Sequence, residues 1–402
     1  MKLVRATPYI VGTPKPHLGG YKWFFVKLET DEGLVGWGEC AVLWSMMGME
    51  DTFERMVADA FERYLLDENP VDRQMLTKRM YGGMTAENPG LFTAGVISAF
   101  DVALWDLTGK FYEAPVCDLL GGKFRDRIRT YTYIYDPDAL EAGDTDDFAD
   151  RWLGGIEGIG EVARKLVDRG FTGLKLDPVE FHGTSTLPLT PYELSMEQYD
   201  TAARTIEAIR NAVGNQADIL IGTHGQTTPS SARRLAKLLE PYNPLWLEEP
   251  CPPENVDEMA RIAQSTTIPI ATGERLAFND FQPLFAAGAC HFAQPDLGGC
   301  GGLTAAREIA SMAEAHYVLM APHVWGGPII TAAALQLDAA IPNFLIQESI
   351  YKSNLFFDEI VEEPFVWEDG DLLVPDRPGH GINLVEEKLV EYKARHGLRR
   401  RS

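Results

Sequence analysis

The chain has 402 residues, of which 45% are hydrophobic and 24% are charged. These proportions exclude intrinsic disorder and collagen-like order, and the length allows two domains with a large buried core. The formal net charge of −23 makes nucleic acids and anionic membranes unfavourable partners, because both carry negative charge.

The five cysteines are odd in number, scattered along the chain and without CxxC spacing. This pattern predicts neither a disulfide framework nor a zinc knuckle. The first residues lack the apolar core and cleavage site of a secretion signal, and no apolar run reaches membrane-spanning length. We therefore expect a cytoplasmic protein.

The first 125 residues predict an α+β domain. Residues 23–30 and 34–39 are typical of two strands joined by a turn at Asp31-Glu32-Gly33. Apolar residues at spacings of three and four predict helices over 51–66 and 94–112. Leu119-Leu120-Gly121-Gly122, a short way beyond the second helix, is a typical helix stop.

From about residue 131 the pattern changes to short apolar runs that alternate with amphipathic helices such as 229–239 and 303–315. This alternation is typical of βαβ units and a parallel sheet. Eight strands are predicted, at 129–134, 172–176, 218–221, 245–247, 269–271, 292–294, 318–321 and 344–346. Eight is the number of strands in a (β/α)₈ barrel, so we assign residues 126–350 to such a barrel. Residues 180–191 predict a long loop, and residues 351–402 a C-terminal segment that returns to the first domain.

Polar side chains follow seven of the eight predicted strands, where they would share one end of a barrel. In chain order they are Lys175, Asp177, His224, Glu248, Glu249, Glu274, Arg275, Asp296, His323 and Glu348. Grouped carboxylates repel one another unless a cation neutralises them, and Mg²⁺ prefers oxygen ligands of this kind. Zinc is disfavoured without cysteine or several histidine ligands. The pattern therefore predicts a magnesium site at the barrel end.

Several of these residues lie in runs that resemble the enolase superfamily. The runs are Trp246-Leu247-Glu248-Glu249-Pro250, Ile270-Ala271-Thr272-Gly273-Glu274-Arg275, Gln294-Pro295-Asp296 before Gly298-Gly299-Cys300-Gly301-Gly302, and Ala321-Pro322-His323. The chain is most similar to the mandelate racemase branch and, within it, to acid-sugar dehydratases of the galactonate and mannonate dehydratase type. The resemblance covers nearly the whole chain and implies a barrel under an α+β capping domain, formed by residues 1–125 and the C-terminal segment.

The resemblance implies a role for each residue at the barrel end. Glu248 and Glu274 would hold Mg²⁺, which binds a substrate carboxylate and stabilises the enediolate formed when the adjacent proton leaves. His323 would be the base, oriented by Asp296. Glu348 would lie opposite, as an acid or a hydrogen-bond donor to the enediolate oxygen. His224 would protonate the departing β-hydroxyl, and Lys175 would neutralise the substrate carboxylate.

The chain departs from the family pattern at two positions. Gly222 stands where the family has a third carboxylate ligand, so His224, Asp177 or water would complete the metal site. Asp177 stands where racemases have a second lysine, which disfavours racemisation and favours β-elimination of water to a 2-keto-3-deoxy acid. The alternatives are a cycloisomerase or epimerase acting on a sugar acid or lactone through the same enediolate, and a catalytically inactive sugar-acid-binding homologue.

The loop at 12–22 is rich in glycine and proline, as expected of a lid over a polyol substrate. We expect Lys15, His17 and Tyr21 from this loop, with Trp325 from the barrel, to contact the substrate. The expected partner is a small-molecule sugar acid, bound by a chain that forms a homo-oligomer.

Overall fold

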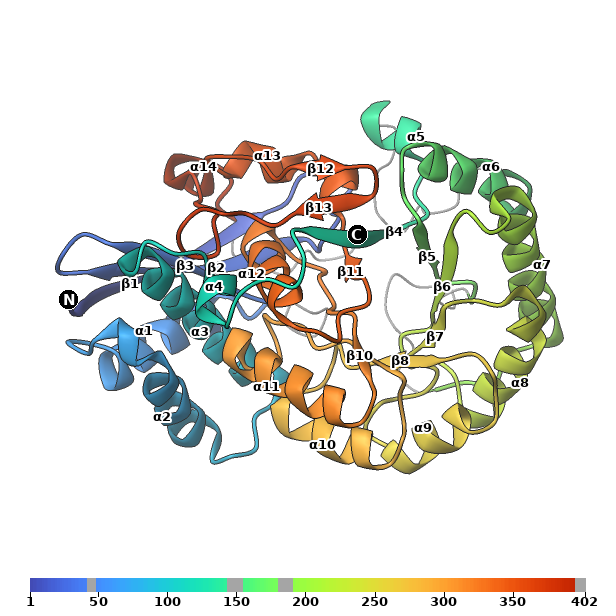
Figure 1. Cartoon of the computed structure of the whole chain (residues 1–402), viewed down its shortest axis with the longest axis horizontal. Helices are drawn as coiled ribbons and strands as arrows, with labels where there is room; N and C mark the ends of the chain where they lie inside the picture. The colour runs from blue at the N-terminus through green and yellow to red at the C-terminus, as the bar shows by residue number, and fades with distance from the viewer. Residues whose placement is uncertain (42–47, 143–154, 180–190, 395–402) are drawn as a thin grey trace.

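The computed structural model describes residues 1–41, 48–142, 155–179 and 191–394. Figure 1 shows a barrel ringed by helices, with a smaller region of strands and helices packed against one side. The part of the predicted loop at 180–190 lies outside the described residues.

The smaller region contains an antiparallel sheet in the order β1-β2-β3, formed by Leu3–Gly12, Lys22–Thr30 and Val35–Cys40. The two predicted strands are confirmed as β2 and β3, whereas β1 was not predicted. Gly33 has a φ of +85° in the turn between them, a conformation that glycine adopts readily. Helices α1 (Glu50–Tyr64), α2 (Arg73–Thr85) and α3 (Leu91–Phe111) follow, with the 3₁₀ turn Pro70–Asp72 before α2. The two predicted helices are confirmed as α1 and α3.

Helix α3 corrects one expectation. It has 21 residues and is apolar enough to cross a membrane by length and composition, although no run of that length was predicted. In the fold, 83% of its apolar window is buried inside the protein. The apolar surface of α3 therefore packs against the rest of the protein. Sixteen consecutive residues of the helix, from Ala94 to Gly109, are buried.

Eight parallel strands form the barrel, which confirms the predicted fold class. They are β4 (Arg127–Tyr133), β5 (Gly173–Leu176), β6 (Asp218–Gly222), β7 (Trp246–Glu248), β8 (Ile270–Thr272), β9 (Phe292–Ala293), β10 (Leu319–Met320) and β11 (Gln347–Glu348). The predicted bounds of the last strand, 344–346, are wrong by a few residues. Phe344 forms an isolated bridge with Met320 of β10, while β11 pairs with β4, so the segment 344–348 closes the barrel by pairing with a different neighbour at each end.

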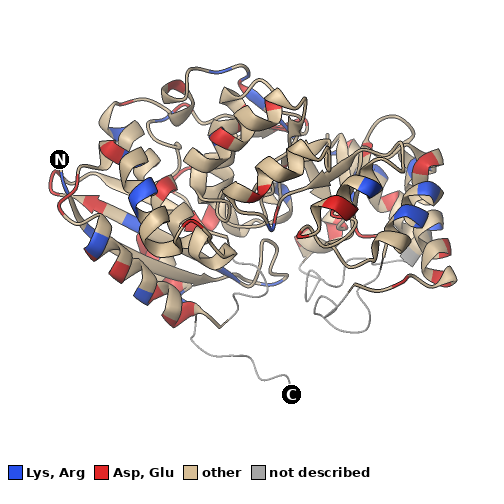
Figure 2. Ribbon diagram, turned by 90° about the horizontal axis from the view of Figure 1, so that it is seen from below, with Lys and Arg blue, Asp and Glu red and all other residues tan. Residues whose placement is uncertain are grey.

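Helices connect the strands and surround the barrel (Figure 1). They are α5 (Pro137–Ala142), α6 (Gly155–Asp168), α7 (Met196–Val213), α8 (Pro229–Leu239), α9 (Val256–Ala263), α10 (Phe278–Ala286), α11 (Gly302–Ala315) and α12 (Pro328–Ala340), with α4 (Val116–Leu119) before the barrel and the 3₁₀ turns Glu240–Tyr242 and Tyr351–Ser353. The predicted helix 229–239 is confirmed as α8, which begins at Pro229 after the side-chain cap Thr228. Figure 2 shows the charged residues spread over the helices with both signs interspersed.

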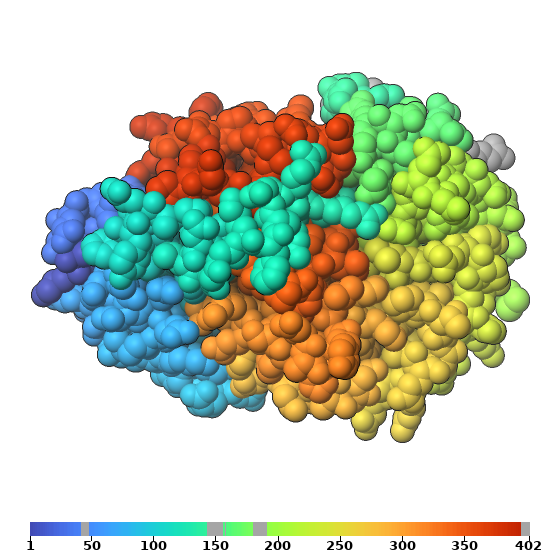
Figure 3. Space-filling view, in the orientation of Figure 1, coloured from blue at the N-terminus to red at the C-terminus, as the bar shows by residue number. Residues whose placement is uncertain are grey.

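The C-terminal segment joins the two regions. It contains α13 (Phe356–Ile360), β12 (Trp367–Glu368), β13 (Asp371–Leu373) and α14 (Glu386–Glu391). Strand β13 pairs antiparallel with β4 of the barrel, while Lys393 bridges to Val11 of β1. In Figure 3 this segment, coloured red, lies over the junction between the N-terminal region and the barrel.

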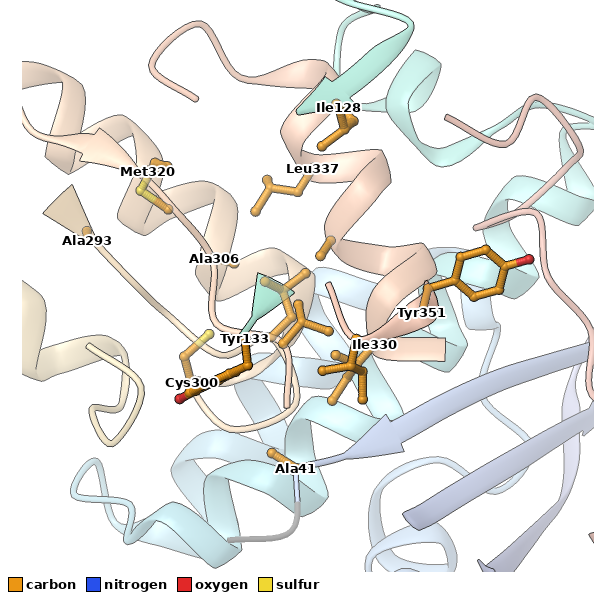
Figure 4. Close-up of a cluster of buried hydrophobic side chains, with 14 of the residues drawn as sticks. Ala41, Ile128, Tyr133, Ala293, Cys300, Ala306, Met320, Ile330, Leu337 and Tyr351 are labelled. Atoms are coloured by element: carbon orange, nitrogen blue, oxygen red, sulfur yellow. The ribbon is translucent and has the colours of Figure 1, made fainter. Parts of the chain in front are cut away.

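The apolar core continues from one region into the other. One buried cluster includes Trp23 and Phe25 of the N-terminal sheet together with barrel and α12 residues. Figure 4 shows Ala41, Cys300 and Ile330 in this cluster, drawn from the end of β3, the loop before α11 and helix α12. Glu39 of β3 adds a polar contact, because its carboxylate accepts hydrogen bonds from the backbone amides of Gly327 and Ile330 at the start of α12.

We predict that Gly38→Ala lowers the free energy of unfolding by about 3 kcal/mol, because β3 and α3 are in contact at this glycine and have no room for a methyl group. A Cβ at Gly38 would overlap the backbone oxygen of Ala99. The matched control is Gly90→Ala, where no atom of the described residues lies within 4 Å of the added carbon. Denaturant unfolding measures both variants, and equal stability of the two would contradict the packing argument.

Candidate active site

His323 and Asp296 are paired at the end of the barrel because of strand register. Strands β9 and β10 pair in parallel, with Phe292 opposite Leu319, and the same register places Asp296 opposite His323 in an isolated bridge. The Nδ1 atom of His323 lies 2.7 Å from Oδ2 of Asp296. Asp296 is held in turn by the Gly298 amide, which donates to its Oδ1 at 2.7 Å. The ring is therefore fixed, with Nε2 on the side away from Asp296.

The Nε2 atom of His323 faces two further carboxylates. It lies 3.5 Å from Oε2 of Glu274 and 3.7 Å from Oε2 of Glu348. Burial alone would lower the pKa of His323, but Glu348, Glu274 and Asp296 raise this pKa to about 10. All three carboxylates are buried, so their charges act on the imidazole with little screening.

Lys175 of β5 is fully buried, and its ammonium contacts carboxylates from strands on both sides of β5. Its Nζ lies 2.5 Å from Oε1 of Glu248 on β7 and 3.6 Å from Oε1 of Glu348 on β11. Burial opposes its charge, but Glu248 and the other groups near it raise the pKa of Lys175 well above its ordinary value. The side chain is therefore an ammonium, and it also lies 5.0 Å from the ring centroid of Tyr133.

Two residues that hold Glu248 were not predicted. The Nε1 atom of Trp246 donates to Oε2 of Glu248 at 3.0 Å, and Nε2 of Gln294 donates to the same oxygen at 2.9 Å. The sequence does contain a signal for Trp246, since residues two apart on a strand share a face. The sequence shows no signal for the lateral contact from Gln294.

Asp177, Gly222 and Glu248 form a row across three neighbouring strands. Leu176 pairs with Ile221 and Gly222 pairs with Glu248, so the residue after Leu176 lies beside Gly222. A Cβ at Gly222 would overlap Oδ1 of Asp177 and would lie 3.3 Å from Cε of Lys175. The space that a side chain at position 222 would occupy is therefore taken by the side chains of β5 and the residue that follows it.

His224 is held in an uncommon backbone conformation, with a φ of +48°. Its carbonyl oxygen accepts a hydrogen bond of 2.9 Å from Arg275, which also donates to both carboxylate oxygens of Glu249. The Nδ1 atom of His224 lies 3.3 Å from Oδ1 of Asp177. Burial lowers the pKa of His224, but Asp177 and Glu274 outweigh this effect and raise it.

Glu248 and Glu274, the two predicted metal ligands, are buried carboxylates at the ends of the adjacent strands β7 and β8. Oε2 of Glu274 accepts no hydrogen bond from the described residues, and although burial acts against ionisation, the nearby cations lower the pKa of Glu274 to about 2. A buried, ionised oxygen without a donor fits a hard cation such as Mg²⁺. Within the described parts of the chain, no group of three or more His, Cys, Asp or Glu side chains is arranged to hold a metal ion. Glu248 and Glu274 are therefore the candidate ligands among the described residues, and Gly222 has no side chain to add a third.

The loop at 12–22 packs on the barrel end. A Cβ at Gly19 would lie 2.6 Å from Cδ1 of Ile350 and 2.8 Å from the oxygen of Gly326, both of which follow barrel strands. Lys15 is exposed, whereas His17 is buried, with its ring 4.6 Å from that of Tyr21.

Trp325, the fourth predicted substrate contact, lies beside the buried site residues. Its ring is 5.6 Å from that of Tyr133, which in turn lies next to Lys175. Trp325 is therefore brought close to the charged residues, while Lys15 remains on the outer face of the loop.

A parallel barrel that gathers buried carboxylates, a lysine and a paired histidine at the carboxyl ends of its strands has the architecture of a barrel enzyme. Residues 158–388 match the model of enolase C-terminal domain-like proteins, and residues 18–121 match that of the N-terminal domain of mandelate racemase / muconate lactonizing enzyme. The chain belongs to the enolase superfamily, in its mandelate racemase and muconate lactonizing enzyme group, which confirms the resemblance seen in the sequence.

Relatives of known name are similar over most of their length. A D-galactonate dehydratase from Pectobacterium atrosepticum is 34% identical over 380 residues, which cover 92% of this chain and 91% of the relative. A D-xylonate dehydratase from Haloferax volcanii is 34% identical over 382 residues, covering 93% and 87%. A crystal structure from Burkholderia SAR-1, named for the mandelate racemase/muconate lactonizing enzyme group, is 40% identical with a TM-score of 0.91, covering 99% of this chain and 96% of its own.

We predict that Lys175→Met lowers the free energy of unfolding by about 3–5 kcal/mol, because it leaves the Glu248 carboxylate buried without its ammonium. The control is Lys237→Met, which breaks a pair with Glu240 in which the lysine side chain is 76% exposed. That variant should change stability by less than about 1 kcal/mol. Denaturant unfolding without added metal compares the two, and adding Glu248→Gln to Lys175→Met should recover part of the loss. Equal losses in the two single variants would show that the buried pair is not coupled.

Proposed function

We propose that the protein is a Mg²⁺-dependent acid-sugar dehydratase that converts a sugar acid into its 2-keto-3-deoxy product. The observation that carries this proposal is the geometry of His323, whose Nδ1 is held by Asp296 at 2.7 Å while Nε2 faces Glu274 and Glu348. A base in this position can take the proton next to a substrate carboxylate. The relatives named D-galactonate and D-xylonate dehydratase support a sugar acid as substrate.

In the first step, the other residues of the site compensate the negative charge that forms on the substrate. Loss of the proton places a second negative charge on the substrate carboxylate, and a divalent cation bound by Glu248 and Glu274 would supply positive charge there. The buried ammonium of Lys175 adds a fixed positive charge beside Glu248. Glu348 is held by the amide of Val324, which donates to Oε2, while its Oε1 lies 3.6 Å from Nζ of Lys175 and accepts no hydrogen bond from the described residues.

The second step needs an acid for the leaving hydroxyl, because hydroxide is a poor leaving group. We assign this role to His224. The residue on the β5 side of the site is Asp177, a carboxylate, where a second base for racemisation would be a lysine. The side chains on the two faces of the site therefore favour elimination of water from the enediolate over re-protonation of the enediolate.

Substrate recognition is assigned to the capping loop and Trp325. His17 and Tyr21 are packed together near the barrel end, and Trp325 lies over Tyr133, so polyol contacts from this side would involve these three residues first. Lys15 would contribute through its charge from the exposed face of the loop. Five-carbon and six-carbon aldonates are the candidates to test.

We expect the purified protein with Mg²⁺ to release a 2-keto-3-deoxy product from at least one member of an acid-sugar library. Semicarbazide derivatisation detects the new keto group, and a parallel reaction with EDTA should lose the activity because charge on the enediolate is no longer compensated. Keto product at full rate with EDTA would argue against the metal. An aldarate, aldonate and uronate library without any turnover would argue against the dehydratase assignment.

We predict that His323→Asn abolishes exchange of the α-proton with D₂O, with a loss of at least about 1,000-fold, because asparagine cannot accept a proton at the Nε2 position. Proton NMR of the substrate measures the exchange. The matched control is His316→Asn, since His316 lies exposed after α11. That control should exchange at the wild-type rate. Exchange that persists in His323→Asn would move the role of base to another residue.

A further inference from the structure

The missing side chain at Gly222 determines where the Asp177 carboxylate points. Asp177 is buried, and its Oδ1 lies in the space that a Cβ at Gly222 would need. On neighbouring parallel strands, side chains in one row point to the same side of the sheet. Because position 222 has no side chain, the Asp177 carboxylate can lie over β6 and approach the segment that follows it, where His224 is located.

The backbone of His224 is fixed independently of this carboxylate. A φ of +48° is uncommon for a residue with a side chain and is strained, so it persists only where neighbouring contacts maintain it. Arg275 maintains it here by donating to the carbonyl of His224 at 2.9 Å, and the amide of Gly225 donates to the carbonyl of Glu249 at 2.7 Å. Glu249 in turn holds Arg275 through two hydrogen bonds, of 3.0 and 2.5 Å. The hydrogen bonds that maintain this backbone conformation therefore fix the position of the His224 side chain.

We propose that Asp177 is a positioning residue for His224, and that Gly222 is required because its missing side chain lets the two residues meet. This inference rests on the proposed function, in which His224 is the acid of the dehydration. The site then contains two His–carboxylate pairs, His323 with Asp296 and His224 with Asp177. In each pair Nδ1 faces the carboxylate, and Nε2 is the nitrogen to which we assign proton exchange with the substrate.

The two pairs account for both protons of the reaction. His323 takes the α-proton at Nε2, and its electron pair remains on the substrate as the enediolate. That electron pair then forms the carbon–carbon double bond while the bond from the β-carbon to its oxygen breaks. The Nε2 proton of His224 goes to the departing hydroxyl, which leaves as water. The enol product tautomerises to the 2-keto-3-deoxy acid, and the histidines end the cycle with their protonation states exchanged.

The charged groups around His224 support a protonated ring at the start of this cycle. Asp177 and Glu274 face it as carboxylates, while Lys175 and the guanidinium of Arg275 are the nearby cations. Asp177 acts most strongly among the groups that favour the imidazolium, because its Oδ1 is only 3.3 Å from Nδ1. That distance is longer than the 2.7 Å of the His323 pair, and such contacts often shorten when substrate binds.

The proposal separates Asp177 from metal binding. In the described residues Asp177 is not part of any group of three acidic, histidine or cysteine side chains arranged for a metal ion. Its Oδ1 contacts His224 instead. Removing the Asp177 charge should therefore affect the loss of water and leave Mg²⁺ affinity and removal of the α-proton nearly unchanged.

The test compares Asp177→Asn and Gly222→Ala, with Gly90→Ala as control because an added Cβ there meets none of the described atoms within 4 Å. Gly222→Ala keeps the carboxylate but pushes it away from His224. Both variants should lose about 100-fold in elimination of water, as expected when an acid is misplaced. Both should keep α-proton exchange, elimination of fluoride from a 3-fluoro substrate analogue, which needs no acid, and Mg²⁺ affinity by calorimetry, each within about threefold of wild type, a tolerance well inside the effects of lost general acid catalysis. Asp296→Asn should instead lose exchange.

Three outcomes of these kinetic and binding measurements would overturn the proposal. Loss of Mg²⁺ affinity in Asp177→Asn would make Asp177 a metal ligand. Wild-type elimination of water in Asp177→Asn would remove it from the reaction. Wild-type behaviour of Gly222→Ala beside an impaired Asp177→Asn would remove the role of Gly222.

A readout that needs no turnover distinguishes failure of this inference from failure of the proposed function. NMR titration of ¹³C-labelled histidine, assigned with His224→Gln, follows the ring of His224 in the resting protein. The pKa of His224 should be lower in Asp177→Asn and in Gly222→Ala than in wild type, and unchanged in Asp296→Asn. If the wild type eliminates nothing, this comparison still decides whether Asp177 positions His224, and an unchanged pKa in both variants overturns the inference.

Discussion

The ammonium of Lys175 joins parts of the barrel that lie several strands apart. It starts on β5 and contacts carboxylates from β7 and β11, which lie on opposite sides of that strand in the sheet. Isolated charges at this depth would be driven to their neutral forms, so each carboxylate near the barrel end depends on a cation to stay ionised. Without a bound divalent cation, Lys175, Arg275 and the two histidines supply these cations, and the geometry of the site follows from how they are shared.

Strand periodicity was enough to predict the end of the barrel at which the charged side chains gather. The spacing of apolar runs predicted eight parallel strands, and in a parallel barrel their carboxyl ends meet. The same periodicity predicted that Asp296 pairs with His323, because residues at equal offsets along neighbouring parallel strands lie next to each other. The fold was therefore accessible from the sequence, as was the gathering of charged side chains at one end of the barrel, because both depend on repeating patterns along the chain.

Contacts between the side chains of neighbouring strands could not be predicted from the sequence in the same way. Whether a missing side chain at Gly222 leaves a vacancy or is filled from the side depends on the rotamer of Asp177, which no spacing encodes. The last strand shows a similar limit. Its apolar run marks where the barrel closes, but residues 344–348 pair with β10 at one end and β4 at the other, so the regular ladder begins three residues later than the pattern indicated.

The path of the C-terminal segment sets the order in which the molecule can be completed. Residues near position 394 hydrogen-bond to β1 at the beginning of the chain, with the amide of Ala394 donating to the carbonyl of Ile10 at 2.8 Å. Synthesis proceeds toward the C-terminus, so this edge of the N-terminal sheet stays unpaired until residues 392–394 have left the ribosome. An exposed strand edge is a site where chains can associate wrongly. The sheet is thus completed only after the barrel has been synthesised, and nascent chains of this protein carry an open edge throughout translation of the barrel.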